Sequence, residues 1–153
     1  MKLNTPLLGE LEYQKEDIIT FATGLPGLEG DREFLILAME EGSPLYYLQS
    51  LNNTSVCLIL AQPFVFFPNY SIEVGEEELK RLECETGAEE LAVYVVLTIP
   101  EDFKQSTANL LAPIIVNSKN KKALQFITQN TDYKIRHNIF PPEQCKAAAV
   151  QEG

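Results

Sequence analysis

The sequence predicts a mainly β protein: a small antiparallel β-barrel or sandwich-like single domain with one short inserted helix. Its 153 residues and 17.2 kDa match the size of one domain. A hydrophobic content of 45% supports a folded core. Short apolar segments, separated by turn-forming residues, recur along the chain, which is typical of antiparallel sheets. About eight such strands cannot cover their faces as one flat sheet, so the sheet must curl or split.

The first segment of the chain predicts a hairpin. Hydrophobic or β-prone residues occupy odd positions there: Leu3, Thr5, Leu7, Leu11 and Tyr13. This period of two predicts paired strands around a turn at residues 8–10. Residues 18–21 predict another short strand. The loop from 22 to 32 contains glycines and a proline that oppose both helix and sheet.

Three apolar segments then follow in quick succession. They are Phe34–Met39, Leu45–Leu51 and Val56–Ala61. Turn-forming Glu-Gly-Ser-Pro and Asn-Asn-Thr sequences separate them. Because each segment has the length of an ordinary strand, we expect three consecutive antiparallel strands.

An aromatic segment comes next, residues 63–70, with the sequence Pro-Phe-Val-Phe-Phe-Pro-Asn-Tyr. As a strand, it would place Phe64 and Phe66 on one face and Val65 and Phe67 on the other. A central strand buried on both faces would explain this pattern. The flanking prolines favour an edge instead, where some rings stay available to a partner.

Residues 76–85, Glu-Glu-Glu-Leu-Lys-Arg-Leu-Glu-Cys-Glu, predict the inserted helix. Acidic residues in its first turn suit the positive end of the helix dipole, and Gly87 is placed to end it. Leu79 and Leu82 share its inner face. Glutamates and basic residues spaced four apart indicate that the other face is solvated.

The second half of the chain predicts further strands. They are Leu91–Ile99, Leu110–Val116 and Leu124–Thr128. Asn109 and Asn117 flank Pro113 within this region. Their side chains would either satisfy backbone groups around the break at the proline or line a recognition surface. The β domain is expected to cover residues 1–140, and the tail 141–153 is expected to be partly disordered or loosely helical.

The charge balance disfavours several classes of partner. Twelve Lys and Arg against 22 Asp and Glu give a net charge of −10 with the single His neutral, so phosphate backbones and anionic lipids are repelled. The sequence contains no apolar stretch suited to a secretion signal or a membrane span. We therefore expect a cytoplasmic protein that binds neither nucleic acid nor a membrane directly.

The sequence predicts no catalytic, cofactor-binding or metal-binding site and no small-molecule substrate. Cys57, Cys84 and Cys145 are too far apart for a zinc motif or a disulfide framework. His137 is the only histidine and so the only candidate imidazole base beside a serine nucleophile; we interpret it as structural. The enzyme alternative is a small hydrolase that uses His137. It predicts an activity that His137→Ala abolishes without disturbing the binding of partners.

The chain also carries a series of sequence blocks in a characteristic order. They are Asn4–Thr5, Asp17–Phe21, Gly24–Glu29, Tyr47–Ser50, Pro63–Tyr70, Thr98–Pro100, Thr107–Asn117 and Tyr133–Phe140. In these blocks, which cover most of residues 4–140, the chain resembles the bacterial FliW family of flagellar assembly factors. Residues 141–153 lie outside the resemblance.

This resemblance implies a non-enzymatic protein with a β-barrel-like fold that binds two protein partners, flagellin and the translational regulator CsrA, and needs no cofactor. As a partner switch it would bind CsrA and relieve the repression of flagellin translation. Flagellin that accumulates in the cytoplasm would occupy it and restore repression. A flagellin-specific cytoplasmic chaperone without regulator antagonism is the alternative.

Two groups of residues are candidate partner-binding sites. For an amphipathic helix of flagellin we predict an apolar groove that includes Phe66, Phe67 and Tyr70. For the basic surface expected of CsrA we predict an acidic face. Its residues are Glu76, Glu77, Glu78, Glu83 and Glu85. A solvated helix face would explain the same glutamates without a partner.

Overall fold

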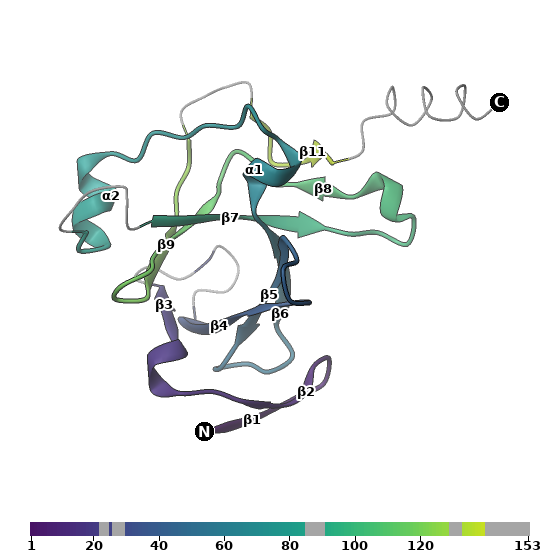
Figure 1. Ribbon diagram of the computed structural model, residues 1–153, viewed down its shortest axis with the longest axis vertical. Helices are drawn as coiled ribbons and strands as arrows, with labels where there is room; N and C mark the ends of the chain where they lie inside the picture. The colour runs from purple at the N-terminus through teal and green to yellow at the C-terminus, as the bar shows by residue number, and fades with distance from the viewer. Residues whose placement is uncertain (22–24, 26–29, 85–90, 129–132, 140–153) are drawn as a thin grey trace.

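Seven strands of the chain close into a barrel (Figure 1). We describe it from a computed structural model that covers residues 1–21, 25, 30–84, 91–128 and 133–139. The barrel strands are β3 (Ile19–Phe21), β4 (Glu33–Ala38), β5 (Leu45–Ser50), β6 (Cys57–Ala61), β7 (Leu91–Thr98), β9 (Ile114–Asn117) and β10 (Lys122–Gln125). The predicted mainly β fold is therefore confirmed, in its barrel form.

The pairing of the strands combines local hairpins with two non-local contacts. Strands β3 to β7 form a continuous antiparallel series, as expected from the short turns between β4, β5 and β6. Strand β10 pairs antiparallel with β9 and parallel with β3. The antiparallel pairing of β7 with β9 closes the barrel and leaves none of these strands as a bare edge along its whole length.

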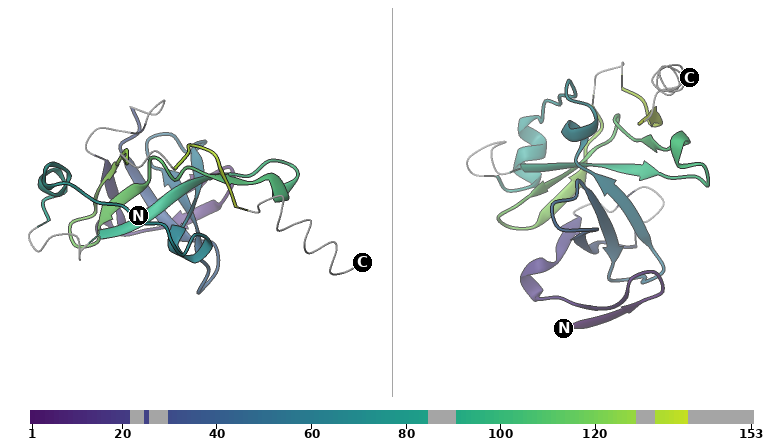
Figure 2. Two further views of the ribbon diagram at one scale, coloured as in Figure 1. Left: turned by 90° about the horizontal axis from the view of Figure 1, so that it is seen from above. Right: turned by 45° about the vertical axis from the view of Figure 1, so that its right-hand side comes forward.

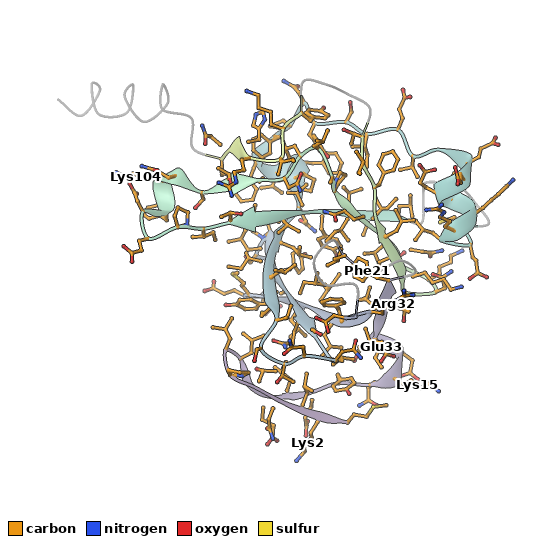
Figure 3. All side chains as sticks on the ribbon, turned by 180° about the vertical axis from the view of Figure 1, so that it is seen from behind. Lys2, Lys15, Phe21, Arg32, Glu33 and Lys104 are labelled. Atoms are coloured by element: carbon orange, nitrogen blue, oxygen red, sulfur yellow. The ribbon has the colours of Figure 1, made fainter. Side chains whose placement is uncertain are left out.

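Alternate residues of the strands fill the barrel. Phe21 and Phe34 are fully buried and meet edge to face with ring centroids 5.3 Å apart. Figure 3 shows Phe21 inside the ring of strands, whereas Lys104 lies at the far tip of the turn after β7. The buried members of this inner cluster are Ile19, Phe21, Leu25, Phe34, Leu48, Leu60, Ile114, Val116 and Ala123.

Along one edge, strand β7 pairs with two different strands. Its first half, Leu91–Tyr94, pairs with β9, and its end, Leu97–Thr98, pairs with β8 (Thr107–Ala108). Strand β8 in turn pairs with β11 (His137–Asn138). This small sheet extension projects beyond the barrel (Figure 2). A 3₁₀ turn, Phe103–Gln105, lies between β7 and β8.

The predicted strand Leu110–Val116 is wrong in its first half. Residues 110–113 leave the ladder between β8 and β9, and only Ile114–Asn117 is a strand. The physical reason is Pro113, which lacks an N–H for the ladder. We call residues 110–113 the bulge. A side chain stabilises it: the Ala112 N–H donates to Oδ1 of Asn109 at 3.0 Å. This confirms the structural interpretation of Asn109.

The predicted strand Leu124–Thr128 is also divided. Strand β10 ends at Gln125, after which the chain turns to follow the bulge. The Phe126 N–H donates to the carbonyl of Pro113 at 2.8 Å, and the Thr128 N–H donates to that of Leu111 at 2.8 Å. The segment 126–128 therefore lies beside the bulge and not in the barrel.

The predicted N-terminal hairpin is confirmed. Strands β1 (Lys2–Thr5) and β2 (Gly9–Glu12) pair antiparallel and form a separate ribbon. Gly9 adopts a φ of 71°, which glycine reaches without the steric cost that a side chain brings. In Figure 1 this ribbon crosses the end of the barrel opposite α1, with a 3₁₀ turn, Lys15–Asp17, before β3.

The predicted strand over the aromatic segment is wrong. Residues Pro63–Phe66 form a short helix, α1, and the Phe67 N–H closes its turn on the carbonyl of Pro63 at 2.8 Å. Proline suits the first turn of a helix because its fixed φ is helical and its missing N–H is not needed there. The side chains of this segment therefore do not alternate between two faces of a sheet, as was predicted for Phe64 and Phe66 on one face and Val65 and Phe67 on the other.

The acidic helix is shorter than predicted. Helix α2 covers Glu76–Arg81, and Glu83 adopts a positive φ of 53°, which ends the helical turn. Leu82 is fully buried against the barrel and Leu79 is half-buried, which confirms the inner face. Gly87, most of the loop 22–32 and the tail 141–153 lie outside the described residues.

Candidate protein-binding site

The aromatic segment forms one wall of a pocket. Helix α1 packs on β7, and Phe66 and Phe67 contact a cluster that contains Val95, Leu97 and Ala108 on the outside of the barrel. A cavity of about 300 Å³ opens beside them. We call it the aromatic pocket. Its lining residues are Phe66, Phe67, Pro68, Asn69, Tyr70, Leu110, Tyr133 and His137. The three predicted groove residues thus lie together.

Tyr70 is the buried wall of the aromatic pocket and not an exposed anchor. It is 4% exposed, and its hydroxyl donates to the carbonyl of Leu110 in the bulge at 2.7 Å. Its ring centroid lies 4.6 Å from that of Tyr133. Burial, with a smaller contribution from Tyr133, raises the pKa of Tyr70, which keeps the hydroxyl neutral and able to donate. A partner could therefore reach Tyr70 only through the pocket.

His137 completes the pocket from the sheet extension. The pairing of β11 with β8 brings its ring edge to face against Phe67, with centroids 5.2 Å apart. The Nδ1 atom of His137 is buried and has no hydrogen-bond partner among the described residues. The ring packs here as part of an aromatic wall, which agrees with the structural interpretation of this histidine.

Exposed apolar side chains extend the pocket outward. Phe64 and Val65 on α1 are 47% and 58% exposed, and the Phe64 ring lies 5.9 Å from that of Tyr70. Ile135, which precedes β11, is 61% exposed. An apolar cavity with exposed apolar residues beside it is the arrangement by which proteins hold the hydrophobic face of a partner helix.

Helix α2 presents the predicted acidic face. Glu76 and Glu77 are exposed and Glu78 is half-buried. Oε1 of Glu77 already pairs with Nη2 of Arg81 at 3.2 Å, and Glu83 forms an ion pair with Lys122. Glu85 lies outside the described residues. Of the described glutamates in this group, Glu76 and Glu78 therefore carry the charge that no ion pair offsets.

Two asparagines hold the acidic helix on the barrel. Nδ2 of Asn117, in β9, donates to the carbonyl of Leu82 at 2.9 Å, and Nδ2 of Asn120 donates to the same carbonyl at 2.9 Å. Oδ1 of Asn117 accepts from the Lys119 N–H at 2.9 Å. Asn117 is 1% exposed. Its structural interpretation is therefore confirmed, and it does not line a recognition surface.

Sequence reasoning missed part of the aromatic pocket. Leu110, Tyr133 and His137 belong to the lining, but they come from distant parts of the chain. No hydrophobic period links them to residues 66–70. Only the bulge and the β8–β11 pairing, which are tertiary features, bring these segments together.

Within the described ranges, no group of three or more His, Cys, Asp or Glu side chains gathers in a way that could hold a metal ion. Cys57 is a half-buried thiol, and burial raises its pKa, which disfavours the reactive thiolate. None of the described helices has the length and apolar character needed to cross a membrane.

Comparison with known proteins identifies the family. The sequence model of the family described as FliW protein matches residues 2–139. Flagellar assembly factor FliW of Syntrophomonas wolfei is 55% identical over 157 residues, covering all of both chains, and that of Geobacillus kaustophilus is 38% identical over 146 residues, covering 95% of this chain and all of the relative. A crystal structure of the flagellar assembly factor FliW superposes with a TM-score of 0.85 at 36% identity, covering 94% of this chain and 99% of that one. The chain belongs to the FliW family of flagellar assembly factors.

Proposed function

We propose that this flagellar assembly factor works in the cytoplasm as a non-enzymatic partner switch between flagellin and the translational regulator CsrA. Bound to CsrA, it relieves repression of flagellin translation. Bound to accumulated flagellin, it releases CsrA and repression returns. Membership of the FliW family supports the role in flagellar assembly, and the aromatic pocket is the observation that carries the binding role.

The aromatic pocket suits one amphipathic helix of flagellin. Its volume of about 300 Å³ accommodates a large apolar side chain, and the hydrogen bond from Tyr70 to the carbonyl of Leu110 holds one wall of the pocket in place. Phe64 and Val65 offer further apolar contact beside it. A preorganised aromatic pocket with an apolar rim concentrates binding energy in a few side chains.

The acidic helix suits CsrA. The expected basic surface of an RNA-binding regulator is attracted to a chain with a net charge of −10. Glu76 and Glu78 of α2 contribute charge that no ion pair among the described residues offsets. Negative charge brought beside the RNA site of CsrA would raise the free-energy cost of binding phosphates there, without the switch protein touching RNA.

Replacement of Phe67 by alanine tests the flagellin site. Phe67 lines the pocket and supports His137, so Phe67→Ala should weaken flagellin binding by about 2 kcal/mol in calorimetry. Phe103→Ala is the matched control, because Phe103 is 60% exposed on the 3₁₀ turn after β7 and does not line the pocket. Circular dichroism checks that both variants fold. Equal affinities for Phe67→Ala and the unmodified chain would remove the pocket from the proposal.

The same titrations separate the switch from the chaperone alternative. A switch binds CsrA, and exchange of Glu76, Glu77 and Glu78 for glutamine weakens that complex. A pure chaperone binds flagellin through the aromatic pocket and shows no binding to CsrA at any salt concentration. If the chain binds neither flagellin nor CsrA, both the switch and the chaperone proposals are refuted.

A further inference from the structure

A second cavity is lined by residues that directly follow Tyr70 in the chain. It has a volume of about 430 Å³ and opens between the extended segment before α2 and the segment after β10. We call it the Thr128 pocket. Its lining residues are Ser71, Ile72, Glu73, Gly75, Glu78, Phe126 and Thr128. None of them lines the aromatic pocket, and only Glu78 is shared with the acidic face proposed for CsrA.

The lining of the Thr128 pocket combines negative charge with apolar side chains. Glu73 and Glu78 supply two carboxylates, and none of its described lining residues is Lys or Arg. The Glu78 side chain folds over Gly75, where a Cβ atom would meet its Oε2 at 3.1 Å. Ile72 and Phe126 add an aliphatic side chain and an aromatic ring. Such a lining attracts a cation that carries a hydrocarbon stem.

The hydroxyl group of Thr128 is a second, independent observation at this pocket. The residue is 7% exposed, its N–H is bonded to the carbonyl of Leu111, and its Oγ1 is buried without any hydrogen-bond partner among the described residues. Buried hydroxyls in folded proteins nearly always have a partner, because an unsatisfied one loses its bonds to water. A hydrogen-bond donor that enters the pocket beside Glu73 and Glu78 would remove this deficit.

We infer that the Thr128 pocket receives the side chain of one arginine from a protein partner. The guanidinium group has five N–H donors in a planar fork, so it can serve Glu73, Glu78 and Thr128 together. Its plane can stack on the Phe126 ring while its methylene stem lies along Ile72. Lysine offers a smaller, more strongly hydrated charge with no plane to stack. The inference rests on the proposed role in binding proteins and specifies the chemistry of one contact.

The test is a titration of the isotope-labelled full chain, followed by the amide NMR signals of Ile72, Glu73 and Thr128. The probe is N-acetyl-arginine methylamide. Its counterparts are the citrulline compound, which has the same shape without the charge, and the lysine compound. The arginine probe should shift these signals and saturate, with citrulline binding at least about tenfold more weakly because the charge-assisted hydrogen bonds are lost.

Variants of the lining give the second measurement. Glu73→Gln and Glu78→Gln should each weaken binding of the arginine probe by about tenfold, and Thr128→Val should weaken it severalfold. Glu101→Gln is the matched control, because it removes the same charge from an exposed turn outside the pocket and should leave binding unchanged. Equal binding of the lysine or citrulline compound, or an equal effect of Glu101→Gln, would overturn the inference. The proposed function is tested separately, by measuring whether the unmodified chain binds flagellin and CsrA.

Discussion

At the scale of single residues, Tyr70 makes both an aromatic contact and a buried hydrogen bond. Its ring lines the aromatic pocket, and its hydroxyl reaches the backbone of the bulge at Leu110. The neighbouring Tyr133 packs on the same ring and accepts a hydrogen bond from the Ser71 N–H at 2.9 Å. The pocket therefore depends on hydrogen bonds between segments that lie far apart in the chain.

Removing the hydroxyl of Tyr70 should destabilise the fold. Tyr70→Phe keeps the ring but leaves the buried carbonyl of Leu110 without this donor, so we expect the free energy of unfolding to fall by about 1–3 kcal/mol. Urea unfolding followed by circular dichroism measures it. Tyr47→Phe is the control, because Tyr47 is a half-buried tyrosine of β5 outside the pocket. A stability equal to that of the unmodified chain would show that the hydrogen bond contributes nothing.

The same hydroxyl predicts a pH dependence. Burial raises the pKa of Tyr70 in the folded state above the ordinary value of about 10. Above pH 10 the unfolded chain therefore loses this proton before the folded chain does, and the free energy of unfolding decreases as pH rises. One such tyrosine contributes up to about 1.4 kcal/mol per pH unit. Tyr70→Phe should show a shallower decrease in urea unfolding between about pH 10 and 11, and an identical slope would contradict the assignment.

At the scale of elements, the local hairpins were predictable and the aromatic segment was not. Strands β4, β5 and β6 follow from three apolar segments with clear turns between them. The segment Pro63–Phe67 has no such period, because four apolar residues in a row fit a helical turn as well as a strand. Tertiary packing on β7 decided in favour of α1. The bulge at residues 110–113 was missed because it needs partners at 126–128 and 134.

The attachment of α2 to the barrel gives a prediction at this scale. Asn117→Ala removes a buried donor to the carbonyl of Leu82 and an acceptor for the Lys119 N–H, so we expect a loss of about 1–3 kcal/mol in the free energy of unfolding. Asn120→Ala should cost less, since its donor to Leu82 is only partly buried. Denaturant unfolding measures both. A larger loss for Asn120→Ala would contradict this account of how α2 is held.

At the scale of the whole molecule, a small barrel or sandwich could be predicted from the sequence. The strand pairings that close the barrel could not. The number of short strands requires the sheet to curl, but the β7–β9 and β3–β10 pairings join residues that are far apart in sequence. For the same reason, residues 66, 67 and 70 could be predicted as one group, whereas Tyr133 and His137 could not be added to it. The net charge, in contrast, needs no fold at all to be known.

That charge predicts a salt-sensitive complex with CsrA. Raising ionic strength from about 0.1 M to 1 M shortens the screening length from about 10 to 3 Å, so we expect the affinity to fall by about tenfold or more. Flagellin binding through the apolar aromatic pocket should change far less over the same range. Calorimetry at several salt concentrations compares the two complexes. A CsrA affinity that is unaffected by salt would exclude the acidic surface as its main contact.

The measurement that tests the switch most directly is the affinity of this chain for CsrA with and without saturating flagellin. A switch requires that each partner weakens binding of the other, because coupling between two sites is reciprocal. We predict that the chain binds CsrA alone and that flagellin lowers this affinity by at least about tenfold, a coupling of about 1.4 kcal/mol. An affinity that flagellin leaves unchanged, or no binding to CsrA in either case, would contradict the account.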